Sequence, residues 1–215
     1  ESGVIRIINS SDPQQFILLF RERLHKSPVT TITISKDHII SGSVDGTVVI
    51  LKCDPSNNFP LIGLLKLNSK IITVATPAPL ADRPQLFIAT GHKEVIRIDI
   101  PEDPPHNFLL NIENLNRAMI KVSNKITSIC TEPTLREDQQ YFYCACDDKT
   151  VKYYCIPLTS GDIDIINTDD IEASAPDDVF VGHAKATSSV ILSPNQQYVA
   201  SGCSGSVLMV REIDV

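Results

Sequence analysis

One short segment recurs four times along this chain, and the repetition limits the possible folds more than any other feature of the sequence. Each copy joins two short apolar runs through a turn made of small and polar residues. The copies begin at Ser41, Thr90, Cys144 and Ser201, so the steps between them are 49, 54 and 57 residues. Periods of this size are typical of repeat proteins, in which each unit buries its apolar face against its neighbours.

The local chemistry within each copy predicts a strand, a turn and a second strand. In the first copy, residues 38–42 and 47–51 are β-branched runs, and Val44-Asp45-Gly46 between them favours a hairpin turn. Another apolar run precedes each hairpin, at residues 29–34, 71–75, 126–130 and 187–192. A further run follows most hairpins, as at 61–67 and 179–181. Four short strands in each repeat predict an all-β fold.

The fourth unit carries the clearest family signature. It reads Gly182-His183, then an apolar strand ending in Ser193-Pro194-Asn195, and then Val199-Ala200-Ser201-Gly202. This order and spacing resemble the WD-repeat β-propeller family, and the resemblance extends over nearly the whole chain. The resemblance implies an all-β, WD-repeat-like β-propeller with about four blades visible, as a partial ring or an unusually small one.

The sequence departs from the family at the residues that usually connect the strands of a blade. The chain has no Trp, and Leu51, Tyr154 and Val210 align with the family's Trp. The family often links a His, a Ser or Thr, an Asp and that Trp by buried hydrogen bonds. The first unit offers His25, Ser41 and Asp45 for such a network. We therefore expect a divergent member whose hydrogen-bond networks are only partly complete.

Two further units lack another member of this network besides the Trp. The fourth unit offers His183 and Ser201 but has Ser204 and Gly205 in the turn, where the Asp belongs. The third unit has Asp148 in its turn but Val122 at the position of the His.

The repeat register predicts one propeller region over residues 1–215. Residues 1–24 supply the third and outer strands of a preceding blade, 25–67, 68–122 and 123–181 form blades, and 182–215 form an incomplete blade. A short helix near residues 12–15 is the alternative at the start. Because an open arc exposes an apolar blade face at each end, we consider three arrangements. The chain is part of a longer propeller, a partner donates blades, or residues 16–24 pair with the last sheet and close a small ring.

Three insertions lie outside the four-strand units. Residues 107–119 place apolar side chains at helical spacing and predict an amphipathic helix that packs on its own blade or binds a partner. Residues 78–85 contain two Pro and predict a surface loop. The acidic connection at 161–178 contains seven Asp or Glu and no Lys or Arg. It predicts a solvated loop, with a docking segment for a basic partner as the alternative.

The sequence offers no combination of residues that indicates catalysis, a cofactor or a metal. The six Cys are read as free buried thiols, and Cys144 and Cys146 lack the spacing of a zinc site. The net charge of −7 argues against nucleic-acid binding. No apolar run reaches the length of about 20 residues that spans a bilayer, and the first residues lack a signal-peptide pattern. We therefore expect an intracellular protein, cytoplasmic or nuclear, with no membrane contact and no small-molecule substrate.

The resulting hypothesis is a non-catalytic protein–protein interaction scaffold within a larger protein or multi-subunit complex. The expected partners are other proteins or further blades of the same protein. Alternatives are a propeller-based enzyme with a central metal or cofactor pocket and an RNA-binding propeller. The family resemblance implies a partner-binding face built from His25, Lys26, Val44, Asp45, His92, Lys93, Asp147, Asp148, His183, Lys185 and Ser204.

Overall fold

The computed structural model describes residues 3–12, 15–77, 85–100, 109–136, 139–157 and 173–213. This part of the chain is all-β, as predicted, with eighteen strands and two single-turn 3₁₀ helices, η1 (Pro55–Asn57) and η2 (Ile112–Asn114). The strands form five consecutive sheets, of which four repeat the same antiparallel order.

The sheets follow chain order. The first sheet is the hairpin of β1 (Val4–Asp12) and β2 (Gln15–Arg23). The second contains β3 (Val29–Ser35), β4 (His38–Ser43), β5 (Thr47–Lys52) and β6 (Leu61–Lys66), with the short β10 (Leu109–Leu110) parallel to β6. The third contains β7 (Ile71–Ala75), β8 (Gln85–Thr90), β9 (Glu94–Asp99) and β11 (Arg117–Lys121). The fourth contains β12 (Ile126–Arg136), β13 (Gln139–Cys146), β14 (Val151–Pro157) and β15 (Asp178–Phe180). The fifth contains β16 (Thr187–Leu192), β17 (Tyr198–Cys203) and β18 (Leu208–Glu212).

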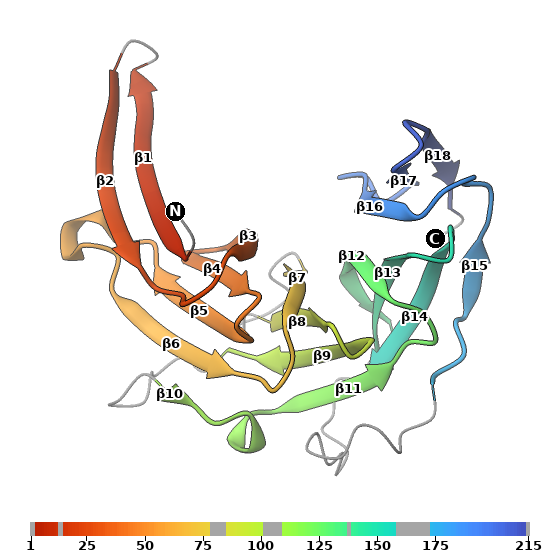
Figure 1. The fold of residues 1–215 in the computed structure, drawn as a ribbon, viewed down its shortest axis with the longest axis horizontal. Helices are drawn as coiled ribbons and strands as arrows, with labels where there is room; N and C mark the ends of the chain where they lie inside the picture. Colours follow the sequence, from red (N-terminus) through yellow and green to blue (C-terminus); the bar gives the residue numbers. More distant parts are fainter. Residues whose placement is uncertain are drawn as a thin grey trace.

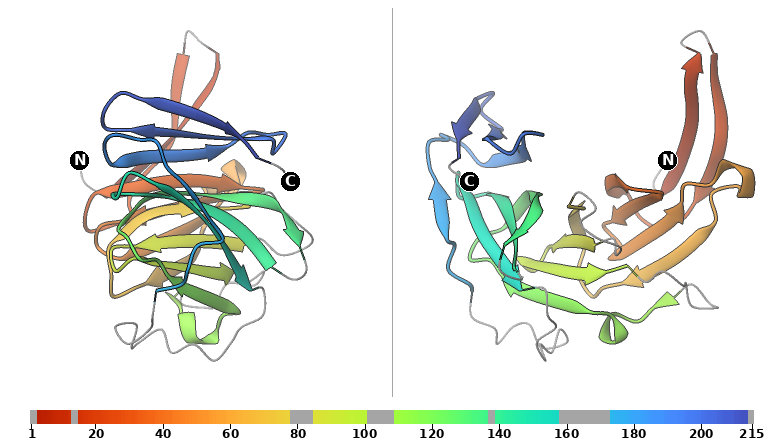
Figure 2. Two further views of the ribbon diagram at one scale, coloured as in Figure 1. Left: turned by 90° about the vertical axis from the view of Figure 1, so that its right-hand side faces the viewer. Right: turned by 180° about the vertical axis from the view of Figure 1, so that it is seen from behind.

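The five sheets are arranged side by side in an open arc (Figure 1). The first strands of the second to fifth sheets, β3, β7, β12 and β16, lie on the inner side of the arc, and the outer strands β6, β11 and β15 lie on its outside. The hairpin β1–β2 projects away from the arc, as both views of Figure 2 show. It exposes four consecutive apolar side chains, from Phe16 to Leu19.

Of the three arrangements considered, closure of a small ring by residues 16–24 does not occur in the described residues. In the described residues β2 pairs with β1 alone, and β18 forms the outer edge of the fifth sheet. The short helix considered near residues 12–15 is also absent there, because β1 extends to Asp12 and β2 begins at Gln15. A hairpin forms instead of a helix because the backbone N–H and C=O groups of β1 and β2 pair with each other.

Apolar side chains from both faces of each sheet fill the space between neighbouring sheets. Ile40 of β4 points toward the third sheet, where it joins a cluster with Ile88. Ile39, its neighbour in sequence, points the other way and packs near Phe20 of the first sheet. Successive residues of a strand face opposite sides of the sheet. Strands between two other sheets are therefore apolar at nearly every position, unlike strands with one face in water.

The amphipathic helix predicted at 107–119 is wrong. The described part of this segment contains β10, η2 and β11. Ala118 and Met119 are buried where β11 pairs with β9, so pairing with the open edge of the third sheet overrides the helical spacing of the apolar residues. Ile112 and Leu115 still pack against the core. The loop expected at 78–85 and the acidic connection at 161–178 fall largely outside the described residues, at 78–84 and 158–172.

Candidate functional site

The hairpin turns and the loops that lead into the inner strands lie together at one end of each sheet, and we call this surface the turn face. It comprises the turns 43–47, 90–94, 146–150 and 203–207 and the loops 24–28, 67–70, 122–125 and 181–186. Backbone hydrogen bonds join each of the four turns to the loop of its own sheet. The N–H groups of Val44, Gly91, Asp147 and Ser204 donate to the carbonyl oxygens of Pro28 (3.1 Å), Lys70 (2.9 Å), Lys125 (3.0 Å) and Ala186 (3.1 Å), respectively.

The strand register shows which residues of the four turns are equivalent. The last pairs before the turns are Gly42–Val48, Ala89–Val95, Ala145–Val151 and Gly202–Leu208, so each turn contains five residues. Thr90 is therefore equivalent to Ser43, and not to Ser41 as its place in the repeat predicted. The residue equivalent to Leu51 and Tyr154 in the fifth sheet is Arg211, so the assignment of Val210 was wrong by one position.

The first turn contains a complete buried hydrogen-bond chain without Trp. The Nδ1 atom of His25 lies 2.6 Å from the Thr47 hydroxyl, and its Nε2 atom lies 2.7 Å from the Ser41 hydroxyl. Because the Thr47 hydroxyl donates to Asp45 at 2.5 Å, it accepts from Nδ1, and Nε2 then accepts from Ser41. The predicted His25–Ser41–Asp45 link is therefore completed by Thr47, which the sequence comparison overlooked.

Asp45 holds the turn to the preceding loop. Its carboxylate accepts the backbone N–H groups of Lys26 (2.6 Å), Ser27 (3.2 Å) and Thr47 (2.9 Å). Burial alone would raise its pKa, but these hydrogen bonds, that of the Thr47 hydroxyl and the nearby His25 lower the pKa of Asp45 to about 2. Burial lowers the pKa of His25, against an opposing effect of Asp45, so the ring is neutral in the hydrogen-bond chain.

These shifts predict loss of stability in acid. Because the pKa of folded Asp45 lies below its ordinary value of 3.8, its contribution is complete above that pH and disappears as the pH falls from about 4 to about 2. We expect a loss of about 1 kcal/mol, reduced by solvent screening of this partly exposed group. Urea unfolding at pH 5 and pH 2.5 measures it. Asp45→Asn should remove this part of the pH dependence, and an unchanged dependence in that variant would contradict the assignment.

The turns of the third and fourth sheets use other polar groups. In the third sheet the Thr90 hydroxyl donates to buried Glu94 at 2.7 Å, and His92 is exposed at the position of Asp45. In the fourth sheet Asp148 accepts from the Thr150 hydroxyl at 2.7 Å and pairs with the Lys152 ammonium at 3.0 Å. These bonds hold the two turns within their own sheets in place of the His chain of the first turn.

Buried Lys152 links the turn of the fourth sheet to the loop that precedes it. Its ammonium also donates to the Ser123 hydroxyl at 3.0 Å and to the Asn124 side chain, in the loop that begins with Val122. The absence of a His at Val122 is thus compensated by a cation that ties the loop to β14, a role that the repeat pattern did not predict.

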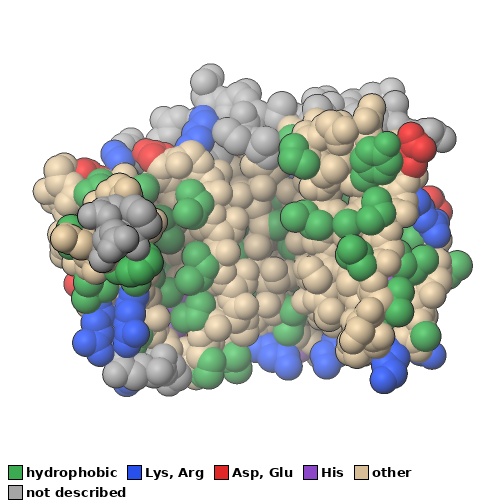
Figure 3. All heavy atoms as spheres, turned by 90° about the horizontal axis from the view of Figure 1, so that it is seen from above, with side chains coloured by type: hydrophobic (Ala, Val, Ile, Leu, Met, Phe, Trp, Pro, Cys, Tyr) green, Lys and Arg blue, Asp and Glu red, His purple; other side chains and the backbone are tan. Residues whose placement is uncertain are grey.

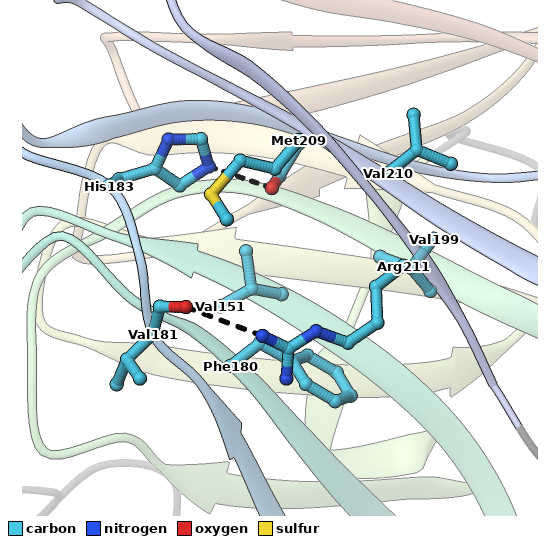
Figure 4. Close-up of a pocket in the computed structure, with 9 residues that line it drawn as sticks. Val151, Phe180, Val181, His183, Val199, Met209, Val210 and Arg211 are labelled. Atoms are coloured by element: carbon cyan, nitrogen blue, oxygen red, sulfur yellow. Dashed lines mark hydrogen bonds between the residues drawn. The ribbon is translucent and has the colours of Figure 1, made fainter.

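The fifth sheet retains half of the chain seen in the first. The Nε2 atom of His183 lies 2.8 Å from the Ser201 hydroxyl, and its Nδ1 atom has no hydrogen-bond partner in the described part of the chain. His183 and Ser201 line a small hollow of about 30 Å³ between the fourth and fifth sheets. Figure 4 shows His183 beside this hollow. Arg211 crosses this hollow, lies 4.7 Å above the Phe180 ring and donates to the Val181 carbonyl at 3.3 Å. A cation over an aromatic ring therefore takes the place of the family's Trp here.

The structure places all eleven residues of the predicted face in these turns and loops, but it separates them by exposure. Those open to solvent are Lys26, Val44, His92, Lys93, Asp147, Lys185 and Ser204, whereas Asp45 and Asp148 are half-buried. His25 and His183 are buried at 2% and 8% exposure. The two histidines and the two half-buried carboxylates hold the turns, so the seven exposed residues are the ones that a partner could contact.

The cysteines form no disulfide, and four of them lie in the fourth sheet. All six are free, three of them are buried, and Cys53 is exposed, so the prediction of buried thiols holds for half of them. Burial raises the pKa of Cys146 to about 12, although Lys152 opposes this shift. Within the described residues no three His, Cys, Asp or Glu side chains form a group that could hold a metal ion.

Four successive antiparallel sheets, packed face to face with their first strands on the inner side of an arc, define a region of β-propeller architecture. A family model described as WD domain, G-beta repeat matches residues 18–51 and 175–210, the segments that contain His25–Ser41 and His183–Ser201. These two segments are similar to WD repeats, as the sequence predicted. No curated protein matches the chain in a sequence search. No helix in the described ranges is long and apolar enough to cross a bilayer.

Proposed function

We propose that this chain is a non-catalytic scaffold that binds other proteins through its turn face, as part of a larger protein or complex. WD repeats generally mediate protein–protein interaction. The single observation that carries the proposal is that the side chains that hold the turns are different from those that the turns expose to solvent. Buried and half-buried polar groups hold the turns and loops of the sheets, whereas exposed side chains such as Val44, Asp147 and Lys185 take no part in these contacts.

The blades in this proposal correspond to residues 25–67, 68–122 and 123–181, flanked by parts of two further blades at 1–24 and 182–215. Each sheet supports its own turn and loop on the same end, so one surface collects a contribution from every blade. Binding residues are commonly carried by loops on a rigid scaffold, because the loops can vary without disturbing the packing beneath them.

The test is a set of substitutions at exposed positions of the turn face. We expect Val44→Glu, Asp147→Lys and Lys185→Glu together to weaken capture of the native partner about tenfold or more, with an unchanged melting temperature. Asp45 and Asp148 are avoided because they hold their turns and their substitution would alter stability. Co-purification of the partner with the full protein provides the measurement.

Lys52→Glu and Glu113→Lys are the matched controls for Lys185→Glu and Asp147→Lys, since they make the same two charge changes at exposed positions away from the turn face. They should leave capture intact. Equal loss in the control variants, or full capture by the turn-face variant, would refute the proposed binding surface.

A further inference from the structure

Every loop that enters an inner strand carries one lysine, although the loops share no common sequence. The first paired residues of β3, β7, β12 and β16 occupy equivalent register positions, opposite Ser43, Thr90, Cys146 and Cys203. A lysine lies one to three residues before each of them, at Lys26, Lys70, Lys125 and Lys185. All four side chains are exposed. The fold therefore repeats a positive charge on the turn face once for each sheet.

Other lysines extend this basic surface. Lys93 and Lys149 lie in hairpin turns and are exposed, and Lys66 and Lys121 end the outer strands β6 and β11 beside the loops. With buried Lys152, nine of the eleven lysines in the chain belong to this end of the sheets. The other two, Lys36 and Lys52, lie at the opposite end of the second sheet. Figure 3 shows Lys and Arg side chains in a row along one edge of the molecule.

Asp148 pairs with buried Lys152, but in the described residues no carboxylate forms an ion pair with the four loop lysines. Asp45, Glu94 and Asp148 are engaged within their own turns, and Asp147 is the one fully exposed carboxylate in the described turns and loops. The chain as a whole carries a net charge of −7, so its positive and negative groups are segregated. A basic surface attracts an acidic partner.

The apolar side chains between the lysines favour an acidic polypeptide over a nucleic acid as the partner. Val44, Val181 and Val207 are exposed at 44%, 64% and 43% on the turn face. The turns and loops contain no Phe, Tyr or Trp on which nucleic-acid bases could stack. Lysines interspersed with aliphatic side chains are complementary to a polypeptide in which Asp and Glu alternate with aliphatic residues.

From this segregation we infer that the turn face binds an acidic, aliphatic-containing segment of a partner protein, with the four loop lysines as its main anchors. The inference rests on the proposed function and specifies the chemistry of the partner. Since the lysines are exposed, the attraction depends on salt, and it mainly raises the rate of association.

The test measures binding of a fluorescein-labelled peptide of alternating Glu, Asp and Leu residues to the full protein by anisotropy. We expect binding that weakens as salt is raised, and a loss of about tenfold or more in the Lys26→Glu, Lys70→Glu, Lys125→Glu, Lys185→Glu variant. The same four lysines changed to Gln should give an intermediate loss, with circular dichroism showing that both variants are folded. Lys36→Glu with Lys52→Glu should bind like the unaltered protein.

Three results would overturn the inference: equal binding of a peptide with Gln and Asn in place of the acids, tighter binding of a single-stranded RNA of equal charge, or unchanged peptide binding by the four-lysine variant. The inference and the proposed function can fail separately. If Val44→Glu with Asp147→Lys abolishes capture of the native partner but the four-lysine variant retains it, the turn face binds a partner that is not acidic. If neither variant affects capture, both are wrong.

Discussion

Replacement of Phe142 by alanine is expected to lower the free energy of unfolding by about 3–5 kcal/mol, the range for large aromatic side chains in a core. Phe142 lies in β13, is fully buried, and its ring centre lies 5.7 Å from that of Phe87 in the third sheet. On its own sheet it stacks with Tyr154, again at 5.7 Å. Truncation therefore leaves a cavity between the third and fourth sheets that neither rigid strand can fill.

Chemical denaturation of the two proteins measures this difference. Phe16→Ala is the matched control, because Phe16 is 72% exposed on the projecting hairpin and its loss should change stability by less than about 0.5 kcal/mol. Similar effects of the two substitutions would mean that Phe142 does not lie between packed sheets.

The second large effect on stability is expected at Gly42. Gly42 and Gly202 occupy equivalent positions in the strand register of their sheets. A Cβ atom at Gly42 would lie 2.6 Å from Cγ2 of Ile71 in the third sheet and 3.0 Å from Cγ2 of Thr31. At Gly202 no atom lies within 4 Å of the corresponding position. We expect Gly42→Val to destabilise the protein by about 2–3 kcal/mol through overpacking, because both contacts belong to stiff β-branched side chains.

Gly202→Val should have no such cost, and it could raise stability by up to about 1 kcal/mol, since glycine is a poor strand residue. Thermal and urea unfolding of the two variants make a direct comparison, because substitution, strand and register are the same. A large loss at Gly202, or none at Gly42, would show that the second and third sheets do not meet as described.

The predictable part of the fold is the part specified by local chemistry. The β-branched runs and the Asp-Gly turn predicted the hairpin at residues 38–51, and it is present as β4 and β5. The helical spacing of apolar residues at 107–119 wrongly predicted a helix. Ala118 and Met119 instead pair with β9, a strand that is distant in sequence. Local periodicity carries no information about such an open sheet edge.

Errors within the site have a related cause. Sequence similarity placed Thr90 two residues away from its true register and Val210 one residue away. The turns share their length but not their residues, so similarity alone does not align them. The role of Thr47 was overlooked, since a Thr after Asp-Gly looks like the start of a strand. The lysine in each loop was also missed as a set, because these loops align only once the strand pairs are known.

The central claim is that partners meet the turn face and no other part of the sheets, and lysine reactivity can test it residue by residue. Acetylation of the full protein, alone and with its partner bound, would be quantified by mass spectrometry. We predict protection of Lys26, Lys93 and Lys185, with unchanged modification of exposed Lys36 and Lys52 at the other end of the second sheet. Protection of Lys36 and Lys52 while the turn-face lysines remain reactive would contradict the account.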